Sequence, residues 1–210
     1  MLFYIAFFIL FFPIMFLYPT KVIHKERFKK KEKYIVTSNH YSNADSLIYI
    51  QKFRTKFRFL GKQELFKTKF LAWVMRGLGV IPIDRGHIAP SVFKQILSEL
   101  NKKHKIFIYP EGTRNKTGID EMQDAKDGVI VFASKGDAEI LPMLIYKKPR
   151  IFRKNYIIVG EPFKVQGENP KRLTKEETAE NLKIYTEKME ALRLELNEYV
   201  DSKKNKKNKK

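Results

Sequence analysis

Two kinds of hydrophobic pattern alternate along the middle of the chain. Short runs of apolar residues are typical of buried strands, and stretches in which apolar residues return every three or four positions are typical of helices. We predict strands over residues 34–38, 57–60, 80–84, 105–109, 140–146 and 156–160. We predict helices between them over residues 45–52, 64–76, 92–100 and 126–134. This alternation predicts an α/β fold with a mixed, largely parallel sheet flanked by helices.

Three of the helices have further sequence signals. Ser91 is the predicted N-cap of the helix over 92–100. The helix over 64–76 has one apolar face, formed by Leu65, Phe66, Phe70, Trp73 and Val74. Thr174 and Glu177 match a capping box, which satisfies free backbone N–H groups at a helix start. We expect the apolar stripe that follows to pack in the core: Leu182, Tyr185, Met189, Leu192, Leu196 and Tyr199.

The first 18 residues carry no charged side chain. As a helix they would extend about 27 Å, close to the ~30 Å hydrocarbon core of a bilayer. Basic residues follow between Lys21 and Lys33, and the positive-inside rule places them in the cytoplasm. We therefore predict a hydrophobic N-terminal membrane anchor over 1–20 and a basic juxtamembrane linker over 21–33. Pro13 leaves re-entrant or interfacial insertion open, and a buried core helix is the alternative.

The charge balance narrows the choice of partners. The chain has 42 Lys and Arg against 23 Asp and Glu, a formal net charge of +19, which predicts an anionic partner. No RNP-like strand, zinc spacing or helix-turn-helix pattern supports nucleic acid, so we expect none. The final segment, residues 201–210, is rich in lysine and is predicted to be a disordered tail that is solvated or touches anionic lipid. The absence of cysteine excludes disulfides, thiolate metal sites and cysteine nucleophiles.

The stretch from Asn39 to Asp45 can carry acid–base chemistry. His40 follows the predicted strand 34–38, and Asp45 falls in the first turn of the next predicted helix. From there the carboxylate could reach back to the imidazole. A carboxylate on one ring nitrogen fixes the tautomer and leaves the other nitrogen free to accept a proton. The alternative is a structural or solvated histidine. We expect no metal, because no further histidine stands at ligand spacing.

A second stretch, from Tyr109 to Arg114, follows another predicted strand, where open α/β sheets bind ligands. Gly112 allows a phosphate to approach the backbone closely. Thr113 offers a hydroxyl group, and Arg114 offers a planar guanidinium for phosphate oxygens. The alternative for this stretch is a tight turn with an ion pair.

Together, the two stretches resemble the glycerolipid acyltransferase family, which includes the 1-acylglycerol-3-phosphate acyltransferases. The first resembles the family's Asn-His-x4-Asp block, the HxxxxD motif, and the second its Phe-Pro-Glu-Gly-Thr-Arg block, with Tyr109 in place of phenylalanine. Two weaker matches are Asp84-Arg85 at the end of a predicted strand and Lys126 with Gly128, where an ordinary solvated lysine is the alternative. The matches run from about Tyr34 to Pro162, within an acyltransferase domain that we expect to span 34–200.

The resemblance implies acyl transfer from acyl-ACP or acyl-CoA to the free hydroxyl of 1-acyl-sn-glycerol 3-phosphate (lysophosphatidic acid), forming phosphatidic acid. His40 would be the general base, oriented by Asp45, with no covalent acyl-enzyme; an acyl-enzyme on Ser42 or Thr113 is the alternative. The residues expected to bind substrate are Asn39, Arg85, Glu111, Gly112, Thr113, Arg114 and Lys126. Because a carboxylate repels phosphate, Glu111 is expected to orient an arginine or to bind a glycerol hydroxyl.

These expectations leave two rival functions. One is the same transfer onto another lysolipid or lipid-linked acceptor, and the other is a non-catalytic basic protein that binds membranes or nucleic acid. No cofactor is expected beyond the acyl donor, which is a co-substrate. The anchor and the charge predict the cell membrane, with anionic lipids as partners and the catalytic domain on its cytoplasmic face.

Overall fold

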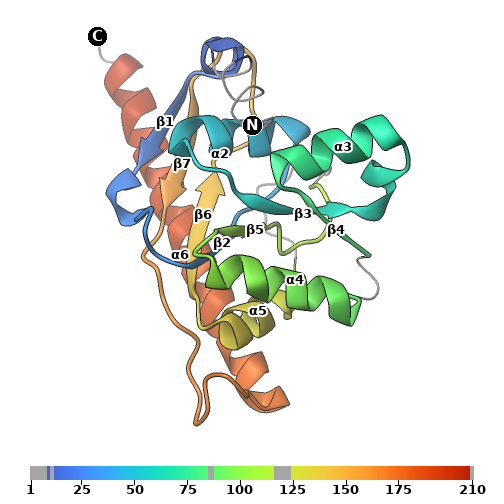
Figure 1. Ribbon diagram of the computed structural model, residues 1–210. Coiled ribbons are helices and arrows are strands. Elements are labelled where there is room, and N and C mark those ends of the chain that lie inside the picture. The colour runs from blue at the N-terminus through green and yellow to red at the C-terminus, as the bar shows by residue number, and fades with distance from the viewer. Residues whose placement is uncertain (1–8, 10–11, 85–87, 116–123, 209–210) are drawn as a thin grey trace.

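The computed structural model describes residue 9 and residues 12–84, 88–115 and 124–208, and it contains a seven-stranded sheet with helices on both faces (Figure 1). The strand order is β1-β7-β6-β2-β5-β3-β4. The strands are β1 Thr20–Ile23, β2 Tyr34–Thr37, β3 Arg58–Lys62, β4 Ile81–Ile83, β5 Ile106–Ile108, β6 Glu139–Ile145 and β7 Asn155–Val159. Neighbouring strands are parallel except β6 and β7. The predicted mixed, largely parallel sheet is confirmed.

The helices are α2 Asn43–Phe53, α3 Lys69–Leu78, α4 Pro90–Asn101, α5 Gly128–Gly136 and α6 Lys175–Asn208, with short 3₁₀ helices η1 Lys25–Arg27 and η2 Gln63–Phe66. Buried side chains of α4, α5 and α6 pack on one face of the sheet, and those of α2 pack on the other. Figure 1 shows α2 and α3 on the same side. Because both faces are covered, β2, β5, β6 and β7 consist mostly of apolar residues.

The central strand β2 delivers the candidate site. All four of its residues are buried. Ile35 packs on the side of α4, α5 and α6, whereas Tyr34 and Val36 pack on the side of α2, since successive strand residues point to opposite faces. Ser38, Asn39 and His40 follow directly at the carboxyl end of β2, beside the end of β5.

The sheet contains one strand that we did not predict. β1 spans the last residue of the expected anchor and the start of the expected linker, and it pairs in parallel with β7, with Thr20 opposite Asn155. Ile23 and Phe28 are buried. The strand has only two apolar residues among its four, too few for its period to be recognised.

The predicted anchor is only partly described, since residues 1–8 and 10–11 lie outside the described residues. Residues 12–17 are helical. Ile14 is buried against the core, whereas Phe12 and Phe16 are 59% and 70% exposed. Over the ranges that the structure describes, no helix has both the length and the apolar character needed to cross a bilayer.

Helix α6 begins as predicted. Thr174 Oγ1 accepts the Glu177 N–H at 3.1 Å, and Glu177 Oε2 accepts the Thr174 N–H at 2.8 Å. The helix continues to Asn208, so the described part of the expected disordered tail is helical. Lysine is a good helix former, and lysines near a helix C-terminus interact favourably with its dipole.

Two other helices differ from expectation. α4 has Ala89 rather than Ser91 as its N-cap, because Pro90 occupies the first helical position. The predicted helix over 64–76 is divided into η2 and α3, with Thr68 Oγ1 accepting the Leu71 N–H at 3.2 Å at the start of α3. Phe70 and Trp73 are 73% and 58% exposed, so the predicted apolar face is largely turned to solvent.

Candidate active site

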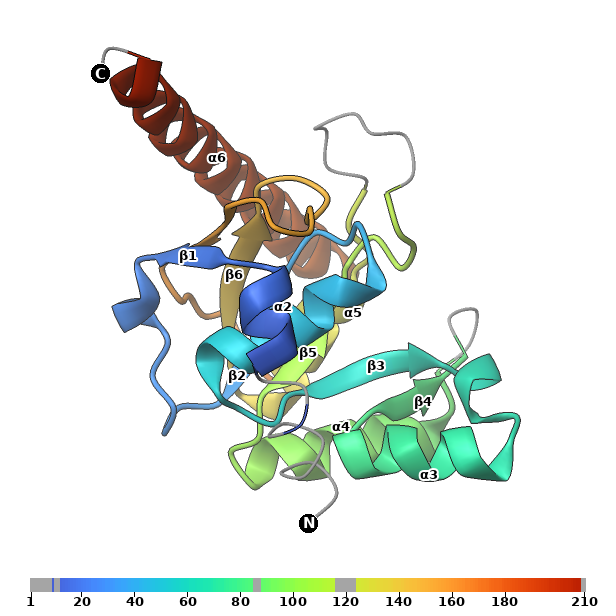
Figure 2. The same cartoon turned by 90° about the horizontal axis from the view of Figure 1, so that it is seen from above.

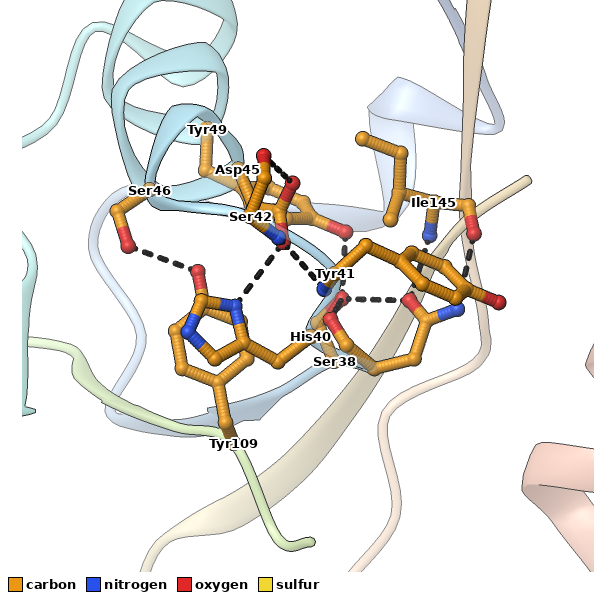
Figure 3. A network of polar contacts seen from close by, with 10 residues as sticks. Ser38, His40, Tyr41, Ser42, Asp45, Ser46, Tyr49, Tyr109 and Ile145 are labelled. Carbon is orange, nitrogen blue, oxygen red and sulfur yellow. Dashed lines mark hydrogen bonds and ion pairs between the residues drawn. The ribbon is translucent and has the colours of Figure 1, made fainter. Parts of the chain in front are cut away.

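His40 and Asp45 are in direct contact (Figure 3). The Nδ1 atom of His40 lies 3.0 Å from Oδ2 of Asp45. The His40 side chain is 12% exposed, whereas that of Asp45 is completely buried. The second ring nitrogen lies on the side away from Asp45. The contact predicted from the five-residue spacing is therefore present.

The Asp45 carboxylate accepts three further hydrogen bonds. Its Oδ2 accepts the backbone N–H groups of Tyr41 at 2.7 Å and Ser42 at 2.8 Å, and its Oδ1 accepts the Ser42 hydroxyl at 2.9 Å. A buried carboxylate is costly unless it is hydrogen-bonded in this way. Its position in the first turn of α2 also places it at the positive end of the helix dipole. These contacts fix the carboxylate and, through it, the imidazole.

The His40 ring stacks on Tyr109, at the end of β5. The ring centroids are 3.8 Å apart and the planes differ by 15°. The Tyr109 hydroxyl is 2.8 Å from Oγ of Ser46 on α2. Burial raises the pKa of Tyr109 well above its ordinary value, so Tyr109 stays neutral. No role could be assigned to Tyr109 or Ser46 from the sequence, because the stacking on His40 depends on β5 lying beside β2.

Asn39 is buried, and its amide binds the end of β6. Its Nδ2 donates to the Ile145 carbonyl and its Oδ1 accepts the Ile145 N–H, both at 2.9 Å. Ser38 Oγ donates to Oδ1 at 3.1 Å and lies 2.7 Å from the Tyr49 hydroxyl. Asn39, which the sequence predicts to bind substrate, holds the His40 loop against β6 through these two bonds with Ile145.

The second motif meets the first through the backbone. The Asn115 N–H donates to the His40 carbonyl at 2.7 Å. Glu111 is 7% exposed, and its Oε2 has no hydrogen-bond partner in the part of the chain that the structure describes. Burial, and then the negative charge of Asp45, raise the pKa of Glu111 to about 7. This carboxyl therefore keeps its proton to a much higher pH than an exposed glutamate does.

A groove of about 580 Å³ begins at the imidazole. Its polar lining includes His40, Thr113 and Arg114. Its apolar walls come from α2, β3, η2, α3 and the residue before β4, through Leu47, Ile50, Phe59, Leu65, Met75, Leu78 and Val80. The groove thus places a base and a guanidinium beside a long apolar surface.

The remaining predicted site residues lie beside this groove or outside the described residues. Gly112, with φ +67°, adopts the left-handed conformation that favours glycine. Gly112 and Lys126 line a neighbouring pocket of about 90 Å³, and a Cβ added at Gly112 would lie 3.4 Å from Cε of Lys126. Arg85 lies outside the described residues. Within the described ranges, no group of three or more His, Asp or Glu residues could hold a metal ion.

The chain is similar to known acyltransferases. The family model described as Acyltransferase matches residues 19–146. The chain is 33% identical over 138 residues to the 1-acyl-sn-glycerol-3-phosphate acyltransferase of Borreliella burgdorferi, a match that covers 65% of this chain and 54% of the relative. The protein of that name from Bacillus subtilis is 25% identical over 149 residues, with 68% and 72% covered.

Among solved structures, the 1-acyl-sn-glycerophosphate acyltransferase PlsC from Thermotoga maritima has a similar fold, with a TM-score of 0.62. The two sequences are 21% identical, and the match covers 86% of this chain and 72% of that one. The chain spans about half the length of the Borreliella burgdorferi relative.

Proposed function

This chain belongs to the acyltransferase family, and we propose that it transfers a fatty acyl group from acyl-ACP or acyl-CoA to the free hydroxyl of 1-acyl-sn-glycerol 3-phosphate, with phosphatidic acid as the product. One observation carries the proposal: an imidazole held by a buried carboxylate lines the same groove as an arginine and a long apolar wall. The printed names of the relatives support the choice of acceptor.

In the proposed reaction His40 acts as the general base. A ring N–H at Nδ1 that donates to Asp45 leaves Nε2 without a proton. Nε2 removes the proton of the acceptor hydroxyl as its oxygen attacks the thioester carbonyl. When the tetrahedral intermediate collapses, the C–S bond breaks, and the imidazolium returns the proton to the leaving thiolate. An ester and a free thiol are formed, and the enzyme regains its starting state.

Two contacts hold the base in position for this step. Asp45 binds Nδ1, and Tyr109 covers one face of the ring. The imidazole can then rotate little about its side-chain bonds. Preorganisation of this kind lowers the barrier because the catalytic group does not have to be aligned during the reaction.

We propose direct transfer without an acyl-enzyme. A serine nucleophile needs a base within hydrogen-bond reach of its hydroxyl. The Ser42 hydroxyl donates to Asp45 Oδ1 at 2.9 Å, so its proton is directed to the carboxylate and not to Nε2 of His40. This favours attack by the lipid hydroxyl itself.

The acceptor phosphate is proposed to bind Arg114, whose guanidinium can form paired hydrogen bonds with phosphate oxygens. Thr113 lines the groove beside it, and Arg85 and Lys126 are proposed as further cations for the phosphate. Glu111 is proposed to bind a glycerol hydroxyl. Its raised pKa reduces the repulsion that a fully ionised carboxylate would exert on the phosphate.

The apolar part of the groove is proposed to hold the acyl chain of the donor. Its walls are side chains such as Ile50, Phe59 and Met75, and burial of each methylene in such a site contributes about 0.8 kcal/mol. We also propose that the hydrophobic segment before β1 anchors the chain in the cell membrane, with the domain on the cytoplasmic face. The acceptor, a membrane lipid, would then be available at the bilayer surface.

The test measures thiol release and the lipid product. Purified full chain is incubated with acyl-CoA or acyl-ACP and one acceptor at a time: lysophosphatidic acid, a lysophospholipid with an amine headgroup, and monoacylglycerol. The proposal expects phosphatidic acid, and at least 100-fold slower transfer to monoacylglycerol. Preference for an acceptor without a free phosphate would identify a different acyltransferase. A sample that shifts DNA but leaves every thioester intact would show a non-catalytic basic protein.

A further inference from the structure

The loop between β6 and β7 carries an exposed apolar pair within a run of basic residues. Residues 147–154 read Lys-Lys-Pro-Arg-Ile-Phe-Arg-Lys, with five basic side chains and no acidic one. Ile151 is 52% exposed and Phe152 is 63% exposed. Neither the proposed chemistry nor the packing of the core requires apolar side chains in this position.

The loop has a fixed conformation. Asn155 Oδ1 accepts the Arg150 N–H at 3.1 Å, and Asn155 Nδ2 donates to the carbonyls of Arg150 at 3.3 Å and Arg153 at 2.8 Å. Phe152 has a φ of 56°, in the left-handed region that bulky residues rarely adopt. A strained conformation that the surrounding structure maintains is often related to function. Here it holds an aromatic ring at the surface.

The described part of the N-terminal segment extends this surface. The Phe152 N–H donates to the Leu17 carbonyl at 2.8 Å, and the Phe16 and Phe152 rings meet edge to face with centroids 5.4 Å apart. Phe16 is 70% exposed and Met15 is 41% exposed. Two segments far apart in sequence thus form one exposed apolar patch.

One lysine of α6, which is also paired with Asp201 at 2.8 Å, contacts the residue that precedes the loop. Lys204 Nζ donates to the Tyr146 hydroxyl at 3.1 Å, directly before the loop. Figures 1 and 2 show the loop and the C-terminal end of α6 near the same end of the sheet. Apolar side chains surrounded by lysine and arginine match the interface of an anionic bilayer. The apolar side chains can enter the acyl region, and the basic side chains can bind the anionic headgroups. An acidic protein would match the charge but not the aromatic tip.

This surface is directly connected to the catalytic loop. Ile145, two residues before the loop, binds both ends of the Asn39 amide, and Asn39 precedes His40. The loop and the imidazole therefore lie at the same end of the sheet, so docking here brings the groove toward the lipid.

We propose that residues 147–154, with Ile151 and Phe152 at the tip, are a membrane-insertion loop for anionic bilayers that acts in addition to the N-terminal segment. The proposal does not depend on acyl transfer. It predicts that the loop enters the interface of vesicles containing phosphatidylglycerol even when the N-terminal segment already holds the chain on the membrane.

The test uses the absence of cysteine in the native chain. The full-length Ile151→Cys variant is labelled with an environment-sensitive fluorophore. Substitution at position 151 leaves both rings of the contact between Phe16 and Phe152 in place. The matched control is Glu168→Cys, an exposed position whose N–H donates to Glu177 Oε1 at the start of α6, far from the end of α6 that carries Lys204. Each protein is reconstituted with vesicles of phosphatidylcholine alone or of phosphatidylcholine with phosphatidylglycerol. Circular dichroism verifies that both fold.

The proposal expects a blue shift and quenching by lipid-borne spin labels at position 151, strongest on phosphatidylglycerol vesicles and reversed by high salt, with no change at 168. The proposal is wrong if the label at position 151 shows no blue shift although the protein co-floats with the vesicles in a density gradient. It is also wrong if the labels at 151 and 168 show equal shifts and quenching. An equal response on both kinds of vesicle would eliminate the role of the basic residues. A response to an acidic protein such as acyl carrier protein but not to vesicles would assign the loop to a protein partner.

Discussion

Glu111 provides a quantitative test of the electrostatics of the site. Glu111→Gln keeps the shape of a buried side chain and removes its charge. The pKa of Glu111 is raised from 4.5 to about 7, first by burial and then by Asp45. A shift of that size corresponds to at most about 3 kcal/mol. Screening by nearby solvent reduces the expected effect to about 1–2 kcal/mol.

The sign follows from proton binding. Between pH 4.5 and 7 the native state holds the Glu111 proton while the unfolded state has released it, so the native state binds more protons. The contribution of this group to stability therefore falls as the pH rises, and the loss is complete above about pH 7. Glu111→Gln has no such loss. The unfolding free energy of the variant relative to that of the wild type should therefore increase from pH 5 to pH 8.

The measurement is urea unfolding of wild type and Glu111→Gln at pH 5 and pH 8. The difference in unfolding free energy between the two proteins should increase by about 1–2 kcal/mol between these pH values. Other titrating groups are common to both proteins and cancel. Exposed Glu187→Gln on α6 is the matched control and should show no such change. A difference for Glu111→Gln that is independent of pH would refute the raised pKa and the partial neutrality of this carboxyl.

Three further predictions concern catalysis. Asp45→Asn should lower kcat for acyl transfer at least 100-fold. It should also reduce the unfolding free energy by about 1–3 kcal/mol, because the buried N–H donors then bind a neutral oxygen in place of a charged one. Kinetics within fivefold of wild type would contradict the role of Asp45. Arg114→Ala or Arg85→Ala should raise the KM for lysophosphatidic acid about 10-fold or more with little change for the acyl donor, and normal acceptor kinetics in both variants would remove the proposed phosphate site. Ile50→Phe should lower kcat/KM for long-chain donors more than for medium-chain donors, since it narrows the groove; an unchanged ratio in a chain-length series would place the acyl chain elsewhere.

The sheet was predictable because most of its strands are buried on both faces. Continuous apolar runs such as Ile106–Ile108 show no competing helical period, and β2 to β7 lie within two residues of their predicted bounds. β1 escaped detection because an edge strand of four residues with Lys21 in it offers too little pattern. The end of α6 was predicted to be disordered from its composition, but the preceding capped and packed turns extend the helix through the lysines.

The contact between His40 and Asp45 was predictable because it is local and depends on the turn into α2. The stacking of His40 on Tyr109 was not, because it requires β5 to lie beside β2. Similarly, the raised pKa of Glu111 depends on burial that the motif does not encode. Asn39 lies in the predicted motif, but its amide binds Ile145, more than 100 residues away in the chain.

The central claim is that the His40 imidazole removes the proton of the lipid hydroxyl, and thiol release by His40→Ala tests it most directly. Wild type and His40→Ala are compared at saturating acyl donor and lysophosphatidic acid, after thermal unfolding has shown that both are folded. The account predicts that His40→Ala releases thiol about 100- to 10,000-fold more slowly than wild type. The variant should still bind lysophosphatidic acid. Release within tenfold of the wild-type rate by the folded variant would contradict it.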